Sequence, residues 1–218
     1  LRIIMKNLNK IASGIFASAL LVLSFSSLKA ETSFGVSIIA GQTDISGTEF
    51  ENGGTTDKNT VSFEEMFVGG SIFLETEAMG MVVGIDYVPL DIELGSGSRS
   101  DTNTGTGSNA SSTQKASADL TDLITLYVNY PVGDNGYYLL GGIHSVTVKT
   151  DESLQNASYG NEDIYGGQFG FGKKVGNLKY EAFYSDFEDI SISSTGGSGE
   201  HSISADADAM GFKISYGF

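Results

Sequence analysis

Large apolar side chains recur at every second position along most of the chain after residue 30. The last nine residues are the clearest example, with Met210, Phe212, Ile214, Tyr216 and Phe218 alternating with Gly211, Lys213, Ser215 and Gly217. A period of two places alternate side chains on opposite faces of a β-strand. This period predicts eight strands, at about residues 33–44, 61–75, 80–92, 118–130, 137–149, 163–173, 178–189 and 205–218, and no helix.

The links between these strands alternate in length. Three are short, "TEAM" at 76–79, "PVGDNG" at 131–136 and "KVGN" at 174–177, whereas four long ones lie near 45–60, 93–117, 150–162 and 190–204. Short turns on one side and long loops on the other are typical of outer-membrane barrels. The pattern therefore predicts an all-β fold, an eight-stranded antiparallel up-and-down transmembrane β-barrel. Residues 95–114 are nearly free of apolar side chains, so we expect a mobile loop there.

The two faces of the predicted strands differ in kind. One face is apolar and the other holds small and polar residues, but alternation alone does not say which face points outward. Two observations favour an apolar face toward lipid. Aromatic residues lie beside the short links, as in an interfacial girdle, at Phe34, Tyr130, Tyr137, Phe171, Tyr180, Tyr216 and Phe218. Glycines on the polar face would also leave a soluble core underfilled. A soluble periplasmic, lipocalin-like binding barrel, with the apolar face inward, stays open as the weaker alternative.

The first 30 residues predict an export signal. A basic start, "MKNLNK" from Met5, precedes an apolar run and then "LKA" before Glu31, which leaves residues 1–4 upstream of the expected start. Residues 31–218 then form one outer-membrane β-barrel domain. Removing the four basic residues of this segment takes the formal net charge from -15 to about -19. Such a charge argues against nucleic acid as a partner, and the absence of cysteine excludes a disulfide framework.

The chain closes on "GFKISYGF", which resembles the C-terminal signature of outer-membrane barrels. Gly211, Tyr216 and Phe218 match the pattern that the barrel-assembly machinery recognises. Together with the export signal and the rhythm of the links, this ending resembles the small outer-membrane β-barrel family, which includes the OmpA transmembrane domain, OmpX and the opacity proteins. The resemblance implies the bacterial outer membrane as location, outer-membrane lipid and lipopolysaccharide as surroundings, and the assembly machinery as a partner of the last strand. We expect a monomer, although nothing in the sequence fixes the oligomeric state.

Five polar residues on the small face are candidates for a network in the lumen. They are Asp86, His144, Gln168, Glu181 and Lys213. Glu181 and Lys213 fall on neighbouring predicted strands and form the most specific expected pair. Such residues suit a gated channel, a small-ligand pocket or a structural network that pairs polar groups in a lumen that side chains just fill. We favour the structural network.

The sequence gives no support for catalysis, a metal site or a cofactor. Deacylases among eight-stranded barrels use a His and a Ser two positions apart, whereas the residues two beyond His144 and His201 are Val146 and Ile203. The acidic runs near the long links do not follow the spacing of a calcium-binding loop and indicate a solvated rim. We therefore expect no enzyme. The sequence predicts an integral outer-membrane barrel with a structural or surface-interaction role, presenting acidic Gly/Ser-rich external loops; a narrow porin-like channel for small solutes is the alternative.

Overall fold

The computed structural model describes residues 32–50, 58–102, 111–152, 159–193 and 202–218. The predicted export signal at residues 1–30, and the central parts of the long links, lie outside these described residues. The domain boundary at residue 31 is therefore still a prediction.

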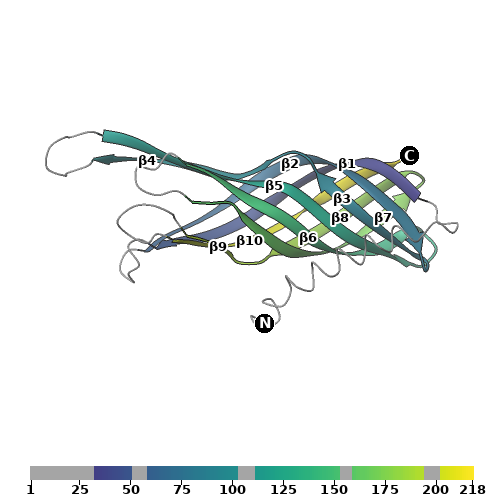
Figure 1. The fold of residues 1–218 in the computed structure, drawn as a ribbon. Coiled ribbons are helices and arrows are strands. Elements are labelled where there is room, and N and C mark those ends of the chain that lie inside the picture. The colour runs from purple at the N-terminus through teal and green to yellow at the C-terminus, as the bar shows by residue number, and fades with distance from the viewer. Residues whose placement is uncertain (1–31, 51–57, 103–110, 153–158, 194–201) are drawn as a thin grey trace.

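The described residues form one closed antiparallel barrel. Its ten strands are β1 (Thr32–Phe50), β2 (Lys58–Ala78), β3 (Met81–Val88), β4 (Ile92–Thr102), β5 (Ser111–Val132), β6 (Tyr137–Glu152), β7 (Glu162–Val175), β8 (Leu178–Phe187), β9 (Ile190–Ser193) and β10 (Ser202–Gly217). β3 and β4 both pair with β5, and β8 and β9 both pair with β10, so the barrel has eight strands in cross-section. β1 pairs with β10 and closes it (Figure 1). The predicted fold class is confirmed. No helix in the described part of the chain is long and apolar enough to cross a membrane.

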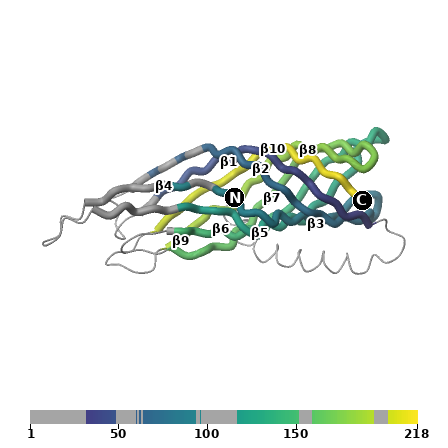
Figure 2. The backbone as a smooth tube through the Cα atoms, turned by 90° about the horizontal axis from the view of Figure 1, so that it is seen from above, coloured from purple at the N-terminus to yellow at the C-terminus, as the bar shows by residue number. Residues whose placement is uncertain are grey.

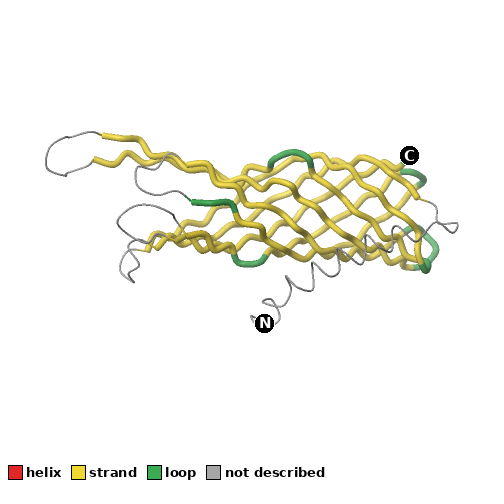
Figure 3. Tube along the Cα trace, in the orientation of Figure 1, coloured by secondary structure: helices red, strands yellow, loops and turns green. Residues whose placement is uncertain are grey.

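The short turns gather at the end of the barrel where β1 begins and β10 ends (Figure 3). Met79 and Gly80 both have positive φ, at 55° and 75°, as a two-residue type I′ hairpin turn requires. This turn lies slightly later than the predicted link at 76–79, because Ala78 still pairs with Met81. The other two turns centre on residues 133–136 and 176–177, as predicted. We call this end the turn end and the opposite end the rim end.

The strands run much further toward the rim end than alternation predicts. The loop expected at 95–114 is wrong for most of its length, because β4 pairs with β5 from Ile92 opposite Leu120 to Thr102 opposite Ser111. This hairpin projects beyond the rest of the barrel (Figure 1). An antiparallel ladder pairs backbone groups whatever the side chains are, so a Ser- and Thr-rich segment continues a pairing that begins in the apolar part of the strand.

A band of apolar side chains surrounds the barrel nearest the turn end. Val68 and Phe212 are 77% and 70% exposed on its outer face. On β1 the band runs from Phe34 to about Gln42, which matches the 9 to 11 residues that a tilted strand needs to cross a bilayer.

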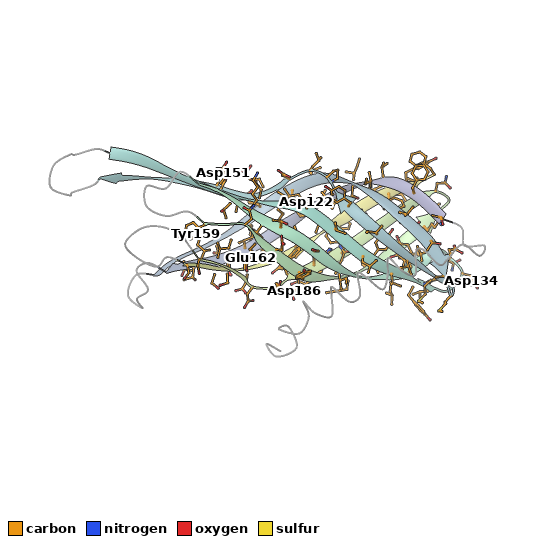
Figure 4. The ribbon with its side chains drawn as sticks, viewed as in Figure 1. Asp122, Asp134, Asp151, Tyr159, Glu162 and Asp186 are labelled. Atoms are coloured by element: carbon orange, nitrogen blue, oxygen red, sulfur yellow. The ribbon has the colours of Figure 1, made fainter. Side chains whose placement is uncertain are left out.

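The band ends at a row of carboxylates on four strands. Glu64, Asp44, Asp208 and Asp186 lie opposite one another in consecutive strand pairs, on the same outward parity as the apolar side chains. We call these four residues the acidic row. Figure 4 shows Asp186 of this row at mid-length of the barrel, with Asp134 at the turn end.

The two faces exchange character beyond the acidic row. Ile45, Val148 and Ile164 point inward there and are buried, while Ser46 and Lys149 face outward and are exposed. The rim half thus has an apolar interior like that of a soluble barrel. The predicted outward direction of the apolar face is found in the turn half, whereas in the rim half the apolar face points inward.

Candidate functional site

Charged side chains cross the lumen in the turn half of the barrel. Five ionisable residues point inward from β2, β3, β8 and β10 and are each less than one-tenth exposed: Glu75, Asp86, Lys179, Glu181 and Lys213. The alternation of the strands places them there, because each shares the parity of the small residues rather than that of the lipid-facing ones. We call these five residues the lumen network.

Glu75 and Lys179 form the first part of the lumen network. The Lys179 Nζ lies 2.6 Å from the Glu75 Oε2, although β2 and β8 are not neighbours in the barrel. The Tyr127 hydroxyl donates to the same carboxylate oxygen at 3.0 Å, and the Lys179 ammonium lies 4.2 Å from the centre of the Phe73 ring. The pair therefore bridges the lumen and has both a hydrogen-bond donor and an aromatic face around it.

Lys213 holds the second part together. Its Nζ lies 2.9 Å from the Glu181 Oε2 and 3.5 Å from the Asp86 Oδ2. Glu181 is the register partner of Lys213 on the adjacent strand, so the structure brings the expected pair into contact. The Tyr138 hydroxyl donates to the other Glu181 oxygen at 2.9 Å. Each of the two buried glutamates thus contacts one lysine and one tyrosine.

His144 and Gln168 form a separate hydrogen-bonded group. The His144 ring nitrogens lie 2.8 Å from the Thr125 hydroxyl and 3.0 Å from the Ser185 hydroxyl, and the ring stacks on Phe187. Gln168 donates to the same Ser185 oxygen at 3.4 Å. The structure therefore divides the five predicted lumen residues into two groups, with Asp86, Glu181 and Lys213 in one and His144 and Gln168 in the other.

Cross-strand pairs of glycine and tyrosine position the two tyrosines. Gly84 lies opposite Tyr127, and Gly172 lies opposite Tyr138. A Cβ added to either glycine would overlap the tyrosine ring opposite, so each ring lies over the bare backbone of its neighbour. The inward glycines thus make room for aromatic rings whose hydroxyls reach the buried glutamates.

Several solved structures of other proteins are similar to this barrel. The NMR structure of outer membrane protein AlkL in lipid bilayers matches with a TM-score of 0.51 at 12% identity, covering 88% of this chain and 93% of that one. The chain has the fold of the small outer-membrane barrels. Crystal structures of OprG from Pseudomonas aeruginosa (TM-score 0.44, 11% identity, 87% and 99% covered) and Neisserial surface protein A (0.43, 8%, 84% and 97%) also match. No protein-family model and no curated protein matches the sequence.

In this outer-membrane barrel fold, the C-terminal residues complete the closing seam. Tyr216 and Phe218 face outward at the turn end, with ring centres 5.2 Å apart, and Phe218 stacks on Phe34 of β1 at 5.3 Å. Gly211 lies between the backbone of Ala40 and the Phe183 ring. Recognition of these residues by an assembly machinery is still a prediction.

Two of the five residues of the lumen network, Glu75 and Lys179, were not among the predicted lumen candidates, and neither were the two tyrosines that contact it. Glu75 and Lys179 lie close to the predicted strand ends, where a charge is usually solvated, and Tyr127 and Tyr138 are aromatic residues on an otherwise small face. Parity alone was a usable signal, since Glu75 continues the inward series of Ser71 and Phe73. Their contacts depend on how strands on opposite sides of the barrel align, which the sequence does not show.

The side chains of the lumen network and its two tyrosines are packed across the lumen. Side chains from six strands meet at this level, and Tyr127 is only 1% exposed. Among the described residues, no group of three or more His, Asp or Glu side chains is arranged to hold a metal ion.

Proposed function

We propose that this protein is an integral barrel of the bacterial outer membrane with a closed lumen and a structural or surface-interacting role. The single observation that supports it best is the lumen network, whose buried ion pairs and tyrosines occupy the cross-section inside a band of outward apolar side chains. Each ammonium group contacts at least one carboxylate, and side chains of this kind, packed across the lumen, leave no open polar passage at that level. The acidic, Ser- and Thr-rich strand ends beyond the acidic row are then the part that meets the surroundings.

The proposal includes a non-enzymatic role. His144 is the described histidine, and both of its ring nitrogens contact hydroxyl groups inside the barrel, while its ring stacks on Phe187. No carboxylate contacts the ring in these interactions to orient it as a catalytic base. We interpret the Thr125, His144 and Ser185 contacts as a means of pairing buried polar atoms.

The partners in this proposal are outer-membrane lipid and lipopolysaccharide, with the assembly machinery acting through the last strand. The apolar band supports the lipid contact, because exposed apolar side chains on every side of a barrel are unfavourable in water. Fractionation of cells that express the chain tests the location. We expect the protein in the outer-membrane fraction, released by detergent; recovery in the soluble periplasm would favour the lipocalin-like alternative instead.

Planar-bilayer conductance tests the closed lumen. The sample is the mature protein, shown to be a closed barrel by its heat-dependent mobility on a gel. We expect no discrete current steps from the wild type. A Glu75→Ala, Lys179→Ala double variant, which removes two side chains that cross the lumen, is the matched control and should conduct if it inserts.

The alternative function, a narrow channel for small solutes, makes the opposite prediction. Lys213 is shared between Asp86 and Glu181 at unequal distances, so it has two partners between which it can move. Reproducible steps from the wild type that change in ion selectivity on Glu181→Gln substitution would replace the closed barrel with this channel.

A further inference from the structure

The buried charges of the lumen network do not balance. Glu75 and Lys179 neutralise one another, but Lys213 has to serve both Glu181 and Asp86. The network therefore contains three carboxylates and two ammonium groups, all of them buried. An excess charge in a region shielded from water is unfavourable unless another group compensates it.

Asp86 is the carboxylate with the weaker partner. Lys213 lies 2.9 Å from Glu181 but 3.5 Å from Asp86, and Glu181 also accepts from Tyr138. The Asp86 Oδ2 and the Glu181 Oε2 are both buried, and among the described residues each has only its Lys213 contact as a partner. Of the two acids that share Lys213, only Asp86 lines the cavity described next.

A cavity of about 60 Å³ lies inside the barrel, on the rim side of Asp86. Its walls toward the rim end are apolar and come from Val88, Ile92, Leu120, Leu123, Phe187 and Ala209. These side chains belong to the apolar interior of the rim half or pack against it. The lining toward the turn end is polar and includes Asp86, Lys213, Thr125 and Ser185. The cavity is thus lined on one side by the Asp86 carboxylate, which has only a weak partner, and on the other side by apolar side chains.

We propose that this cavity binds a small primary ammonium compound with a short apolar chain. The ammonium group donates to the Asp86 Oδ2 and supplies the missing positive charge, while the chain packs between Leu120 and Phe187 toward the rim end. One water occupies roughly 10 to 15 Å³ by a comparable measure, so the cavity holds about four to six groups of that size. An amine with a chain of about three or four carbons fits this volume.

The chemistry of the site distinguishes this ligand from its competitors. An inorganic cation needs several oxygen ligands around it, and the described residues contain no group of three or more acidic or imidazole side chains placed to supply them. A carboxylate ligand would add to the excess negative charge. A neutral alcohol fits the walls equally well but leaves the charge uncompensated.

Methyl NMR on the detergent-solubilised mature protein tests the site. The probes are n-butylammonium, 1-butanol and butyrate, titrated at neutral pH against protein labelled at its Ile, Leu and Val methyl groups. We expect saturable shifts at Val88, Ile92 and Leu120 with n-butylammonium, with an affinity at least about tenfold higher than that of 1-butanol, as a single charge-assisted hydrogen bond provides. We expect the weakest response with butyrate.

Two variants and one control make the test specific. Asp86→Asn should lower the affinity for n-butylammonium by about tenfold or more and leave 1-butanol unchanged. Ala209→Leu should remove binding of both by filling the cavity, without changing any charge. Asp186→Asn removes a carboxylate from the acidic row on the outer face (Figure 4) and should bind like the wild type.

Several results would overturn the proposal. Equal affinity for the amine and the alcohol in the wild type would show that the Asp86 side of the cavity does not recognise positive charge. Shifts confined to outward methyls such as those of Val68 would show partition into the detergent. Undiminished amine binding by a folded Ala209→Leu variant would place the amine outside this cavity, which decides the question even if Asp86→Asn does not fold.

Discussion

At the scale of single residues, the lumen is built from reciprocal pairs of very small and very large side chains. Tyr127 and Tyr138 each lie over a glycine on the next strand and each donate to a buried glutamate. The glycine and the tyrosine of each pair depend on one another. The tyrosine ring fits only because the opposite residue has no side chain, and the buried glutamate needs the tyrosine hydroxyl as a hydrogen-bond donor. The space left by the missing side chain of each of these glycines is therefore filled by a tyrosine ring from the neighbouring strand.

Gly84→Ala should destabilise the barrel. The added methyl group overlaps the Tyr127 ring, whose hydroxyl is held by Glu75, so overpacking should lower the free energy of unfolding by about 1 to 3 kcal/mol. Urea unfolding in detergent micelles measures the change. Gly69→Ala is the matched control, because its Cβ meets open space, and an equal loss there would contradict the packing argument.

Lys179→Met should be strongly destabilising because it leaves Glu75 buried without its cation. Breaking a buried ion pair on one side typically costs about 3 to 5 kcal/mol, whereas replacing both partners by apolar residues is often close to neutral. We therefore expect the Glu75→Leu, Lys179→Met double variant to recover most of the stability. If both variants unfold at the same urea concentration, the pair is not coupled as the 2.6 Å contact implies.

At the scale of elements, each strand changes its environment partway along its length. In the turn half the outward parity is apolar, and beyond the acidic row the inward parity is apolar instead. The strands and the short turns are predictable from the sequence, because a strict alternation with Gly-rich turns is a local signal. The strand extensions of β4 and β5 are not, since Ser, Thr and Gly show no alternation where both faces are polar or small.

The contacts of the lumen network also divide into those that follow from neighbouring strands and those that depend on the whole barrel. Only the first kind is predictable from the sequence. Glu181 and Lys213 were foreseeable as neighbours because consecutive antiparallel strands fix their register. Glu75 and Lys179 meet through the centre of the barrel, and that contact depends on how far the strands are staggered around the closed sheet. Local sequence does not encode that stagger.

Val68→Arg should locate the lipid-facing band. A charge on the lipid face costs roughly 2 to 4 kcal/mol near the middle of the bilayer, so the free energy of folding into lipid vesicles should fall by that amount. Ser46→Arg, which is also outward but lies beyond the acidic row, should be nearly neutral. Equal effects at both positions would contradict a boundary at the acidic row.

The acidic row makes the stability of the barrel depend on pH. Partial burial, and then the nearby Asp44 and Asp186 carboxylates, raise the pKa of Asp208 above its usual value. A raised carboxyl pKa means that the folded state binds the proton more tightly than the unfolded chain does. The charged form therefore costs stability at neutral pH, and this cost is relieved as the pH falls through the raised pKa.

Asp208→Asn should accordingly stabilise the barrel at neutral pH. Like charges on directly opposite strand positions cost roughly 0.2 to 1 kcal/mol, and the variant should gain about that much. Urea midpoints measured at several pH values should converge with those of the wild type under acidic conditions. Asp134→Asn, in a turn at the opposite end (Figure 4), should show no such gain, and a pH-independent gain at Asp208 would point to packing rather than charge.

At the scale of the whole molecule, closure of the sheet explains how the backbone is held without disulfide bonds. The sequence has no cysteine, and the eight strands that cross the apolar band, β1, β2, β3, β5, β6, β7, β8 and β10, each pair with a neighbour on both sides. Backbone groups that face lipid need partners within the protein, and only a sheet without edges supplies all of them. The lumen network then fills the space that closure creates.

The seam between β1 and β10 has a further consequence for the order of the chain. The Phe218 amide donates to the Phe34 carbonyl at 2.8 Å, and Figure 2 shows the last strand beside the first. Because Phe218 lies beside the start of β1, a short linker from Phe218 to that strand would allow new termini to be opened at the Gly176 turn, giving a circular permutant with the same sheet. Such a permutant should refold in vitro yet no longer end on Phe218. It would therefore test the contribution of Phe218 to the folded barrel separately from the predicted recognition of the C-terminal strand by the assembly machinery.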